Sequence, residues 1–422
     1  MKKHQTLNYK FEAWDMLQHI FQGKKITDHT MRFVAKFSGE LDLERLKEAV
    51  NLSSEAFPLI RCRLNENRYR PRWEDGNYSA NDIVYYVETT DVSEIVTRFL
   101  RESMDALFGP QLKIAVIRSE NSDTLCVSIN HMLCDAAGFK NYLYMLSDIY
   151  IDLKSKPDYR AWAMGNRRIG QIYKTFSLRH KLKILYSTSN RTPDPTEFDF
   201  EEAAGSPFAE LRMIPREQFT HLKIYAKEHG ATVNDVFLTA YMRLLYRYFG
   251  HTVVVPCVVD LRKYLPDRKE KGICNLISNL TCDIGPEIGS LFEHTLLKVT
   301  KAMDKQKADI SCVKDPIVME KAYNILPYKL TRNIVQKVYS NSKIEFTNIG
   351  VFDKTKLVFG EAEINEAYIL GSIKYRPHFE LSVSTFDDAA TFCVHYSGTS
   401  ADKEKISQFL NRLVRELQIL CD

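Results

Sequence analysis

Strand-like and helix-like segments alternate along most of this 422-residue chain, and this alternation is the strongest constraint on its fold. In the first half, strand character is found in residues 30–39, 58–64, 111–119 and 124–130, and helical spacing in residues 41–57 and 138–153. Strand character returns in residues 251–261, 275–284, 343–352, 366–375, 378–386 and 390–398, and helical spacing in residues 290–307, 316–340 and 401–420.

Asp42 is placed to cap the first helical segment. The clearest helix spans residues 232–250, where Thr232 and Asp235 have capping-box spacing and Gly250 is a typical stop. The pattern predicts an α/β fold, and the chain is long enough for two lobes that each bury a core.

The composition is that of a globular protein, with 45% hydrophobic and 27% charged residues. The net charge of +4 is small for this length, which argues against a dedicated nucleic-acid-binding protein. The nine cysteines are odd in number and form no C-x-x-C pair, so we expect reduced thiols. The N-terminus has no apolar signal-peptide core, and the longest apolar run, residues 253–259, is too short to span a bilayer. These features predict a cytoplasmic protein without a membrane span.

The regular pattern is lost between about residues 157 and 205, where prolines and glycines indicate a crossover between two halves. We predict an N-terminal lobe over residues 1–165, a crossover linker over 166–205 and a C-terminal lobe over 206–422. Residues 159–193 contain no acidic residue but eight basic ones, namely Arg160, Arg167, Arg168, Lys174, Arg179, Lys181, Lys183 and Arg191. This run suits either a solvated helix face or a binding surface for cofactor phosphates or an acidic partner.

The signatures of several common enzyme classes are absent from the sequence. It has no G-x-S-x-G elbow, no P-loop, no G-x-G-x-x-G loop and no H-E-x-x-H motif. This argues against the usual serine hydrolases, P-loop proteins, dinucleotide-binding enzymes and zinc proteases. The histidines are scattered without ligand-like spacing, so we predict no metal site.

One histidine comes at the end of a predicted strand, in the stretch SINHMLCDAAGF of residues 128–139. His131 ends the strand, and Asp135 follows four residues later, before a helical segment. Imidazole has an ordinary pKa of about 6.5, so it can accept a proton near neutral pH. Asp135 could orient the histidine directly, or could hold the loop through a cation elsewhere. Taken alone, the H-x-x-x-D pattern favours an ordinary histidine at a strand end.

The segment NHMLCDAAGF resembles the H-H-x-x-x-D-G signature of the chloramphenicol acetyltransferase-like superfamily. This superfamily includes peptide-synthetase condensation domains, BAHD acyltransferases, and alcohol and wax-ester acyltransferases. Further segments are similar to the family in the same order, namely FSGELDLERLKEAV, FPLIRCRL, LFGPQLKIAVI, TVNDVFLTAYMRLL, VVDLRKYLP with NLISNLT, and EFTNIGVFD. The resemblance covers nearly the whole chain and implies two acetyltransferase-like lobes, each a mixed sheet with helices, with the active site between them.

The resemblance also implies roles for individual residues. His131 is the expected general base, which would deprotonate a hydroxyl or amine acceptor. Asp135 is expected to pair with an arginine, for which Arg262 is the best candidate. Thr347 and Asn348 lie where the family helps to position the thioester carbonyl. Asn348 could instead stabilise the turn before a glycine two residues later.

Two positions depart from the family signature. Asn130 replaces the first histidine, and we place it with the substrate-binding or oxyanion candidates. Ala136 replaces the glycine after the aspartate, and Gly138 is the expected loop-shaping residue. Because glycine permits a positive φ that alanine disfavours, the loop could have a different shape here.

The implied activity is that of an O- or N-acyltransferase without a tightly bound cofactor. Its donor would be acyl-coenzyme A or an acyl group on the phosphopantetheine of an acyl-carrier protein, and its acceptor a small molecule. A single chain favours coenzyme A over a carrier, and two lobes in one chain favour a monomer. The alternative is a catalytically degenerate condensation-like domain that binds a carrier protein or a small ligand.

Overall fold

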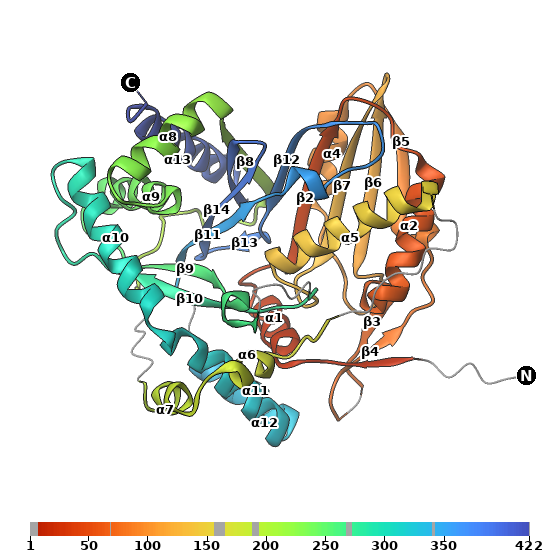
Figure 1. The fold of residues 1–422 in the computed structure, drawn as a ribbon, viewed down its shortest axis with the longest axis horizontal. Coiled ribbons are helices and arrows are strands. Elements are labelled where there is room, and N and C mark those ends of the chain that lie inside the picture. Colours follow the sequence, from red (N-terminus) through yellow and green to blue (C-terminus); the bar gives the residue numbers. More distant parts are fainter. Residues whose placement is uncertain are drawn as a thin grey trace, which may run out of the picture.

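Two mixed β-sheets form the cores of two lobes in the computed structural model, which describes residues 7–67, 69–155, 165–187, 194–266, 272–339 and 342–421 (Figure 1). The first sheet has the strand order β12-β2-β7-β6-β5. Its strands are β2 (Thr30–Phe37), β5 (Val84–Glu88), β6 (Leu112–Ser119), β7 (Ser122–Asn130) and β12 (Ile364–Leu370). Strands β5 and β6 pair in parallel, whereas the other neighbours in this sheet are antiparallel.

Apolar side chains cover both faces of the first sheet. Phe33 and Ala35 belong to the main core, with residues of α2 (Leu43–Ala56) and α5 (Ala136–Ser155). Val34, between them in β2, belongs to a separate cluster with Phe99 of α4 (Val92–Arg101). Because successive strand residues point to opposite faces, both faces of β2 are buried.

The second sheet has the order β10-β9-β11-β14-β15-β13, and β8 pairs with β15. Its strands are β8 (Ser206–Ile214), β9 (Val255–Asp260), β10 (Ile277–Cys282), β11 (Ile344–Val351), β13 (Lys374–Tyr375), β14 (Phe379–Phe386) and β15 (Ala389–Gly398). The helices gathered on this lobe are α8 (Arg216–Glu228), α9 (Val233–Phe249), α10 (Phe292–Ala308) and α13 (Ser400–Gln418) (Figure 1). A small third sheet joins β1 (Asn8–Lys10), β4 (Arg72–Asp75) and β3 (Cys62–Asn65).

Strand β12 shows that chain order and lobe do not fully coincide. It comes from the second half of the sequence, yet it pairs antiparallel with β2, with Ala367 opposite Ala35 and Tyr368 opposite Val34. The segment predicted as the C-terminal lobe therefore supplies an edge strand of the first sheet. The two halves of the chain are joined by this sheet as well as by the crossover.

The segment predicted as a crossover linker contains two helices, α6 (Gly170–Thr175) and α7 (Leu178–Tyr186). Ile172 and Ile184 anchor them in the core. Glu320 of α11 (Lys314–Ile325) accepts hydrogen bonds from two backbone N–H groups at the start of α6, at 2.9 and 2.6 Å. Helices α1 (Ala13–Gly23) and α12 (Tyr328–Val338) both contact α11. Arg160 and Arg191 of the basic run lie outside the described residues.

Local sequence signals account for several helix boundaries. Thr232 and Asp235 form the predicted capping box, and Gly250 ends α9 with a φ of 76°, which confirms both predictions. The predicted strand at residues 58–64 is wrong at its start, because Pro58 begins a 3₁₀ turn, η1 (Pro58–Arg61). The predicted helix over 316–340 is two helices, since Pro327 prevents α11 from continuing into α12. The remaining short elements are α3 (Ala80–Ile83), η2 (Leu261–Tyr264), η4 (Ile310–Val313) and η5 (Lys354–Lys356).

All nine cysteines are free thiols, and eight of them are buried. Among the described residues, no helix is both long and apolar enough to cross a membrane.

Candidate active site

His131 directly follows β7 and is held by its backbone to the segment before β2. Its N–H donates to the carbonyl of His29 at 2.8 Å. The residue keeps part of its surface exposed, while its Nδ1 atom is buried and has no hydrogen-bond partner among the described residues. Burial lowers the pKa of His131 below its ordinary 6.5, although the negative charges of Asp135 and Glu380 oppose this shift. The ring is therefore neutral at pH 7 and able to accept a proton.

Asp135 and Arg262 meet across the two lobes, as the resemblance implies. Arg262 Nη1 lies 3.0 Å from Asp135 Oδ2, and both side chains are buried. Asp135 also accepts hydrogen bonds from the backbone N–H groups of Gly138 and Leu276, each at 2.7 Å. Its carboxylate thus fixes the loop after His131 against the second lobe, which is the loop-holding role that the sequence left open.

Arg262 also binds the chain on its own side of the site. Its Nη2 atom donates to the carbonyls of Cys274 at 2.8 Å and Gly272 at 3.3 Å, and its Nη1 lies 3.1 Å from Asp260. A guanidinium can serve several acceptors at once because its donors are fixed in a planar fork. Arg262 therefore joins the His131 loop to the segment that leads into β10.

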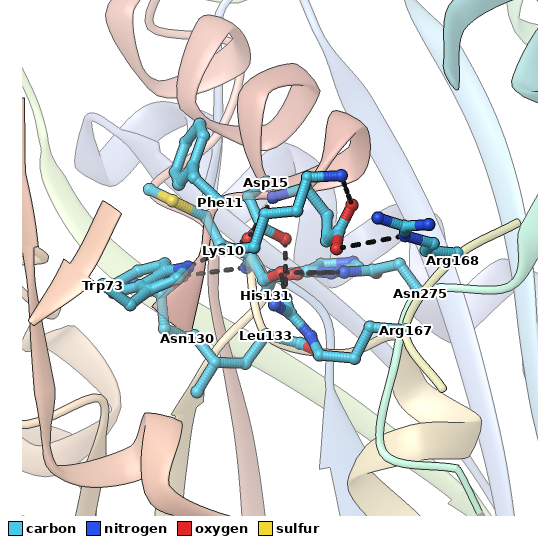
Figure 2. Close-up of polar contacts among 12 residues, drawn as sticks. Lys10, Phe11, Asp15, Trp73, Asn130, His131, Leu133, Arg167, Arg168 and Asn275 are labelled. Carbon is cyan, nitrogen blue, oxygen red and sulfur yellow. Dashed lines mark hydrogen bonds and ion pairs between the residues drawn. The ribbon is translucent and has the colours of Figure 1, made fainter. Parts of the chain in front are cut away.

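Two further side chains hold the carbonyls of the His131 loop (Figure 2). Asn275 Nδ2 donates to the carbonyls of His131 at 2.9 Å and Met132 at 3.1 Å. Arg167 Nη2 donates to the Met132 carbonyl at 3.1 Å. The loop is thereby fixed from the second lobe by Asn275 and from the crossover by Arg167.

Arg167 is itself held by a buried carboxylate of α1. Its Nη2 atom lies 2.6 Å from Asp15 Oδ1, and Asp15 is fully buried. The Oδ2 atom of Asp15 accepts from Trp73 Nε1 at 2.9 Å and from the Glu12 N–H at 3.0 Å (Figure 2). We call Asp15, Arg167 and Asn275 the loop clamp. Sequence reasoning missed all three in this role, because Asp15 and Arg167 are 152 residues apart and share no local pattern.

Replacing Arg167 with alanine should destabilise the protein by about 3–5 kcal/mol, because Asp15 would remain buried without its cation. The neighbouring Arg168 provides a matched control, since its side chain is 55% exposed and lies 3.8 Å from Glu12. Arg168→Ala should change stability by less than about 1 kcal/mol. Urea unfolding measures both changes.

Adding Asp15→Asn to the Arg167→Ala variant should restore part of the lost stability, because no unpaired charge then remains buried. Equal unfolding midpoints for Arg167→Ala and Arg168→Ala would show that the clamp contributes nothing.

Both polar atoms of the Asn130 side-chain amide are hydrogen-bonded to other residues of the protein. Its Nδ2 donates to Gln111 Oε1 at 2.6 Å, its Oδ1 accepts from the Met132 N–H at 2.9 Å, and the residue is fully buried. We expected Asn130 among the residues that contact substrate. The observed contacts favour a role in shaping the loop.

The second sheet carries the two oxyanion candidates on β11. Asn348 Oδ1 accepts from the Gly350 N–H at 2.8 Å, and Asn348 Nδ2 donates to Asn234 Oδ1 at 2.8 Å. Gly350 has a φ of 82°, so Asn348 supports the turn that the sequence offered as its alternative role. Thr347 Oγ1, in contrast, is buried without a hydrogen-bond partner in the described part of the chain. Among the described residues, no hydrogen bond joins Thr347 or Asn348 to His131.

Lys140 of α5 bridges the two lobes beside this turn. Its Nζ donates to the carbonyl of Ile349 at 2.7 Å, and burial lowers the pKa of Lys140 to about 8. No sequence pattern signals this contact, because a lysine in a helix is normally solvated.

The substituted glycine of the signature causes no strain. Ala136 is the first residue of α5 and does not have a positive φ, so alanine needs no unfavourable backbone conformation there. Gly138 is needed for space, because a Cβ there would lie 2.8 Å from Cys134 Cβ and 2.9 Å from the Cys274 carbonyl oxygen. The start of α5 can therefore approach the second lobe closely only without a side chain at residue 138.

Known proteins resemble this chain both in sequence and in fold. Residues 16–307 match the family model of the condensation domain. Over 267 residues, 57% of this chain, the sequence is 22% identical to one of the plipastatin synthase proteins of Bacillus subtilis (strain 168), and the chain spans 10% of the length of that protein.

Three solved structures illustrate the shared fold. The first condensation domain of the calcium-dependent antibiotic synthetase matches with a TM-score of 0.70 and 15% identity over 98% of this chain and 97% of that one. Trichothecene 15-O-acetyltransferase of Fusarium sporotrichioides matches with a TM-score of 0.68 and 11% identity over 99% and 95% of the two chains. Polyketide synthase associated protein 5 of Mycobacterium tuberculosis matches with a TM-score of 0.67 and 13% identity over 99% of both chains.

Proposed function

This chain belongs to the condensation-domain family of the chloramphenicol acetyltransferase-like superfamily, and on that premise we propose that it transfers an acyl group from a thioester to an alcohol or amine. The observation that carries the proposal is a neutral imidazole, belonging to a partly exposed residue, on a loop that both lobes hold in place. A base fixed in this way is suited to general-base catalysis, which contributes about 10²–10⁴ in rate.

In the proposed reaction, His131 accepts the proton of the acceptor as its oxygen or nitrogen attacks the thioester carbonyl. Because Nδ1 is buried, Nε2 is the atom that meets the acceptor. The tetrahedral intermediate then collapses, the carbon–sulfur bond breaks, and the imidazolium returns its proton to the leaving thiolate. Protons and charge balance over the cycle, so the protein needs no further acid.

Thr347 is the better of the two oxyanion candidates, because its hydroxyl is free of protein partners among the described residues while the Asn348 amide is engaged. A hydroxyl aimed at a developing oxyanion contributes about 10²–10³ in rate. Asp135 and Arg262 act as positioning residues, since their contacts fix the loop and do not reach the imidazole nitrogens.

Condensation domains use thioester-bound substrates, and the donor proposed here is acyl-coenzyme A or an acyl group on a carrier protein. The peptide-synthetase relative is consistent with a carrier, whereas the acetyltransferase of the same fold is consistent with a free acyl donor. We favour acyl-coenzyme A, a small acceptor and a monomer with one lobe over residues 1–165, to which β12 adds an edge strand, and the other over residues 206–422.

The test is release of free thiol from acyl-coenzyme A and from acylated carrier protein, measured with a panel of alcohols and amines. We expect thiol release that depends on the acceptor, together with an acylated product seen by mass spectrometry. Binding of the thioester without turnover by any acceptor would contradict the proposal and favour a degenerate domain that only binds its ligand.

A further inference from the structure

Helices α7 and α12 both expose a stripe of large apolar side chains. On α7, Leu178, Leu182 and Leu185 are 75%, 46% and 49% exposed, and Tyr186 beside them is 83% exposed. These positions follow the i, i+4, i+7 spacing of one helix face. Single exposed apolar residues are common on protein surfaces, but a continuous stripe indicates a contact surface.

The same arrangement recurs on α12. Leu330, Ile334 and Val338 are 47%, 42% and 77% exposed and follow each other at intervals of four residues. Leu330 and Ile334 lie away from the buried residues of this helix, Tyr328 and Thr331. Val338 follows Thr331 along the helix, but it lies in the last turn and is 77% exposed, so the stripe is not part of the core.

The two helices belong to one region of the molecule. Helix α7 contacts η4, η4 contacts α11, and α11 contacts α12. Lys183 of α7 lies 3.2 Å from Asp309 beside η4, and Lys314 of α11 donates to the carbonyl of Ser187 after α7. Figure 1 shows α7, α11 and α12 together along the lower edge of the molecule. We call the exposed stripes of α7 and α12 the helical edge.

The charged residues of the two helices themselves have one sign, although Lys183 is paired with Asp309 beside η4. Three basic residues lie on each helix, and neither helix contains an acidic residue. They are Arg179, Lys181 and Lys183 on α7, and Lys329, Arg332 and Lys337 on α12. The whole chain has a net charge of only +4, so positive charge is concentrated here. The active site accounts for Arg167 of the acid-free run but not for these α7 residues.

We propose that the helical edge docks on an anionic lipid surface. Amphipathic helices with leucine-rich faces and flanking lysines lie in the interface of such membranes, with the apolar side chains inserted and the cations near the headgroups. An acidic protein partner is less consistent with the composition, because lysine is depleted in protein interfaces, and four of the six cations here are lysine. This inference does not depend on the catalytic assignment.

The test is flotation of the full chain with vesicles of phosphatidylcholine alone or mixed with phosphatidylglycerol. We expect binding to the anionic vesicles that weakens with added salt. The double variant Leu182→Asn/Ile334→Asn should bind at least about tenfold more weakly, because it removes an apolar anchor from each stripe. Lys181→Ser and Lys329→Ser should each weaken binding by about fivefold.

The matched control changes two apolar residues of comparable exposure on other helices. Ile224 of α8 and Leu297 of α10 are 52% and 54% exposed, so Ile224→Asn/Leu297→Asn should bind as the wild type does. Thermal unfolding and thiol release from a water-soluble thioester should be equal in all variants, which separates docking from folding and from catalysis. Equal binding to neutral and anionic vesicles would overturn the proposal. The same would follow from an equal loss of vesicle binding in the control variant, or from binding to an acidic carrier protein without binding to vesicles.

Discussion

Replacing His131 with alanine is expected to lower kcat for acyl transfer by about 10²–10⁴-fold. The variant loses the group that takes the proton of the acceptor, while the backbone contacts of the loop remain, since the His131 N–H and carbonyl take part in them and the ring does not. The KM of the thioester donor should therefore stay within a few-fold of the wild-type value. Steady-state kinetics with thiol release measures both constants.

The matched control for this variant is His221→Ala, because His221 is an exposed histidine of α8 in the second lobe. It should leave kcat unchanged. Equal kcat values for the wild type and the His131 variant would remove His131 from the reaction.

Breaking the Asp135–Arg262 pair is expected to lower both the stability of the protein and the rate of acyl transfer. In Arg262→Ala, the carboxylate of Asp135 stays buried and keeps only its two backbone donors, Gly138 and Leu276. Removing one member of a buried ion pair typically costs about 3–5 kcal/mol. The loop that carries His131 also loses its link to the second lobe, so kcat should fall as well.

Urea unfolding is the measurement, and the midpoint should fall without a change in slope. Arg216→Ala is the control, because Arg216 pairs with Asp387 at the surface, where its side chain is 63% exposed. Such a pair contributes about 0–1 kcal/mol. An Arg262→Ala variant as stable as Arg216→Ala would contradict the role assigned to the buried pair.

Features determined by neighbouring residues could be predicted from the sequence. Asp42 caps α2 by accepting from the Arg45 N–H, and Thr232 with Asp235 begins α9, because capping needs only a few residues in order. The family signature located His131, and a second segment supplied Arg262, although Asp135 and Arg262 are 127 residues apart.

Features that depend on distant parts of the chain could not be predicted in this way. The pairing of β12 with β2 is decided by the tertiary fold, so its residues read as an ordinary strand of the second half. The crossover looked irregular because its helices are short and are held by contacts such as those of Glu320 with the start of α6. Asp15 and Arg167 carry ordinary charges in the sequence, and only the fold makes them a buried pair.

The central claim, that His131 accepts the proton of the acceptor, is tested most directly by the pH dependence of kcat/KM with an alcohol acceptor. Because burial lowers the pKa of His131, the neutral form persists at pH 7 and is lost only as the pH falls below 6.5. We predict a constant kcat/KM across neutral pH, an acid limb with its midpoint below 6.5, and loss of that limb from the residual activity of His131→Ala. An acid limb that persists unchanged in this variant, or a midpoint above 6.5 in the wild type, would contradict the account.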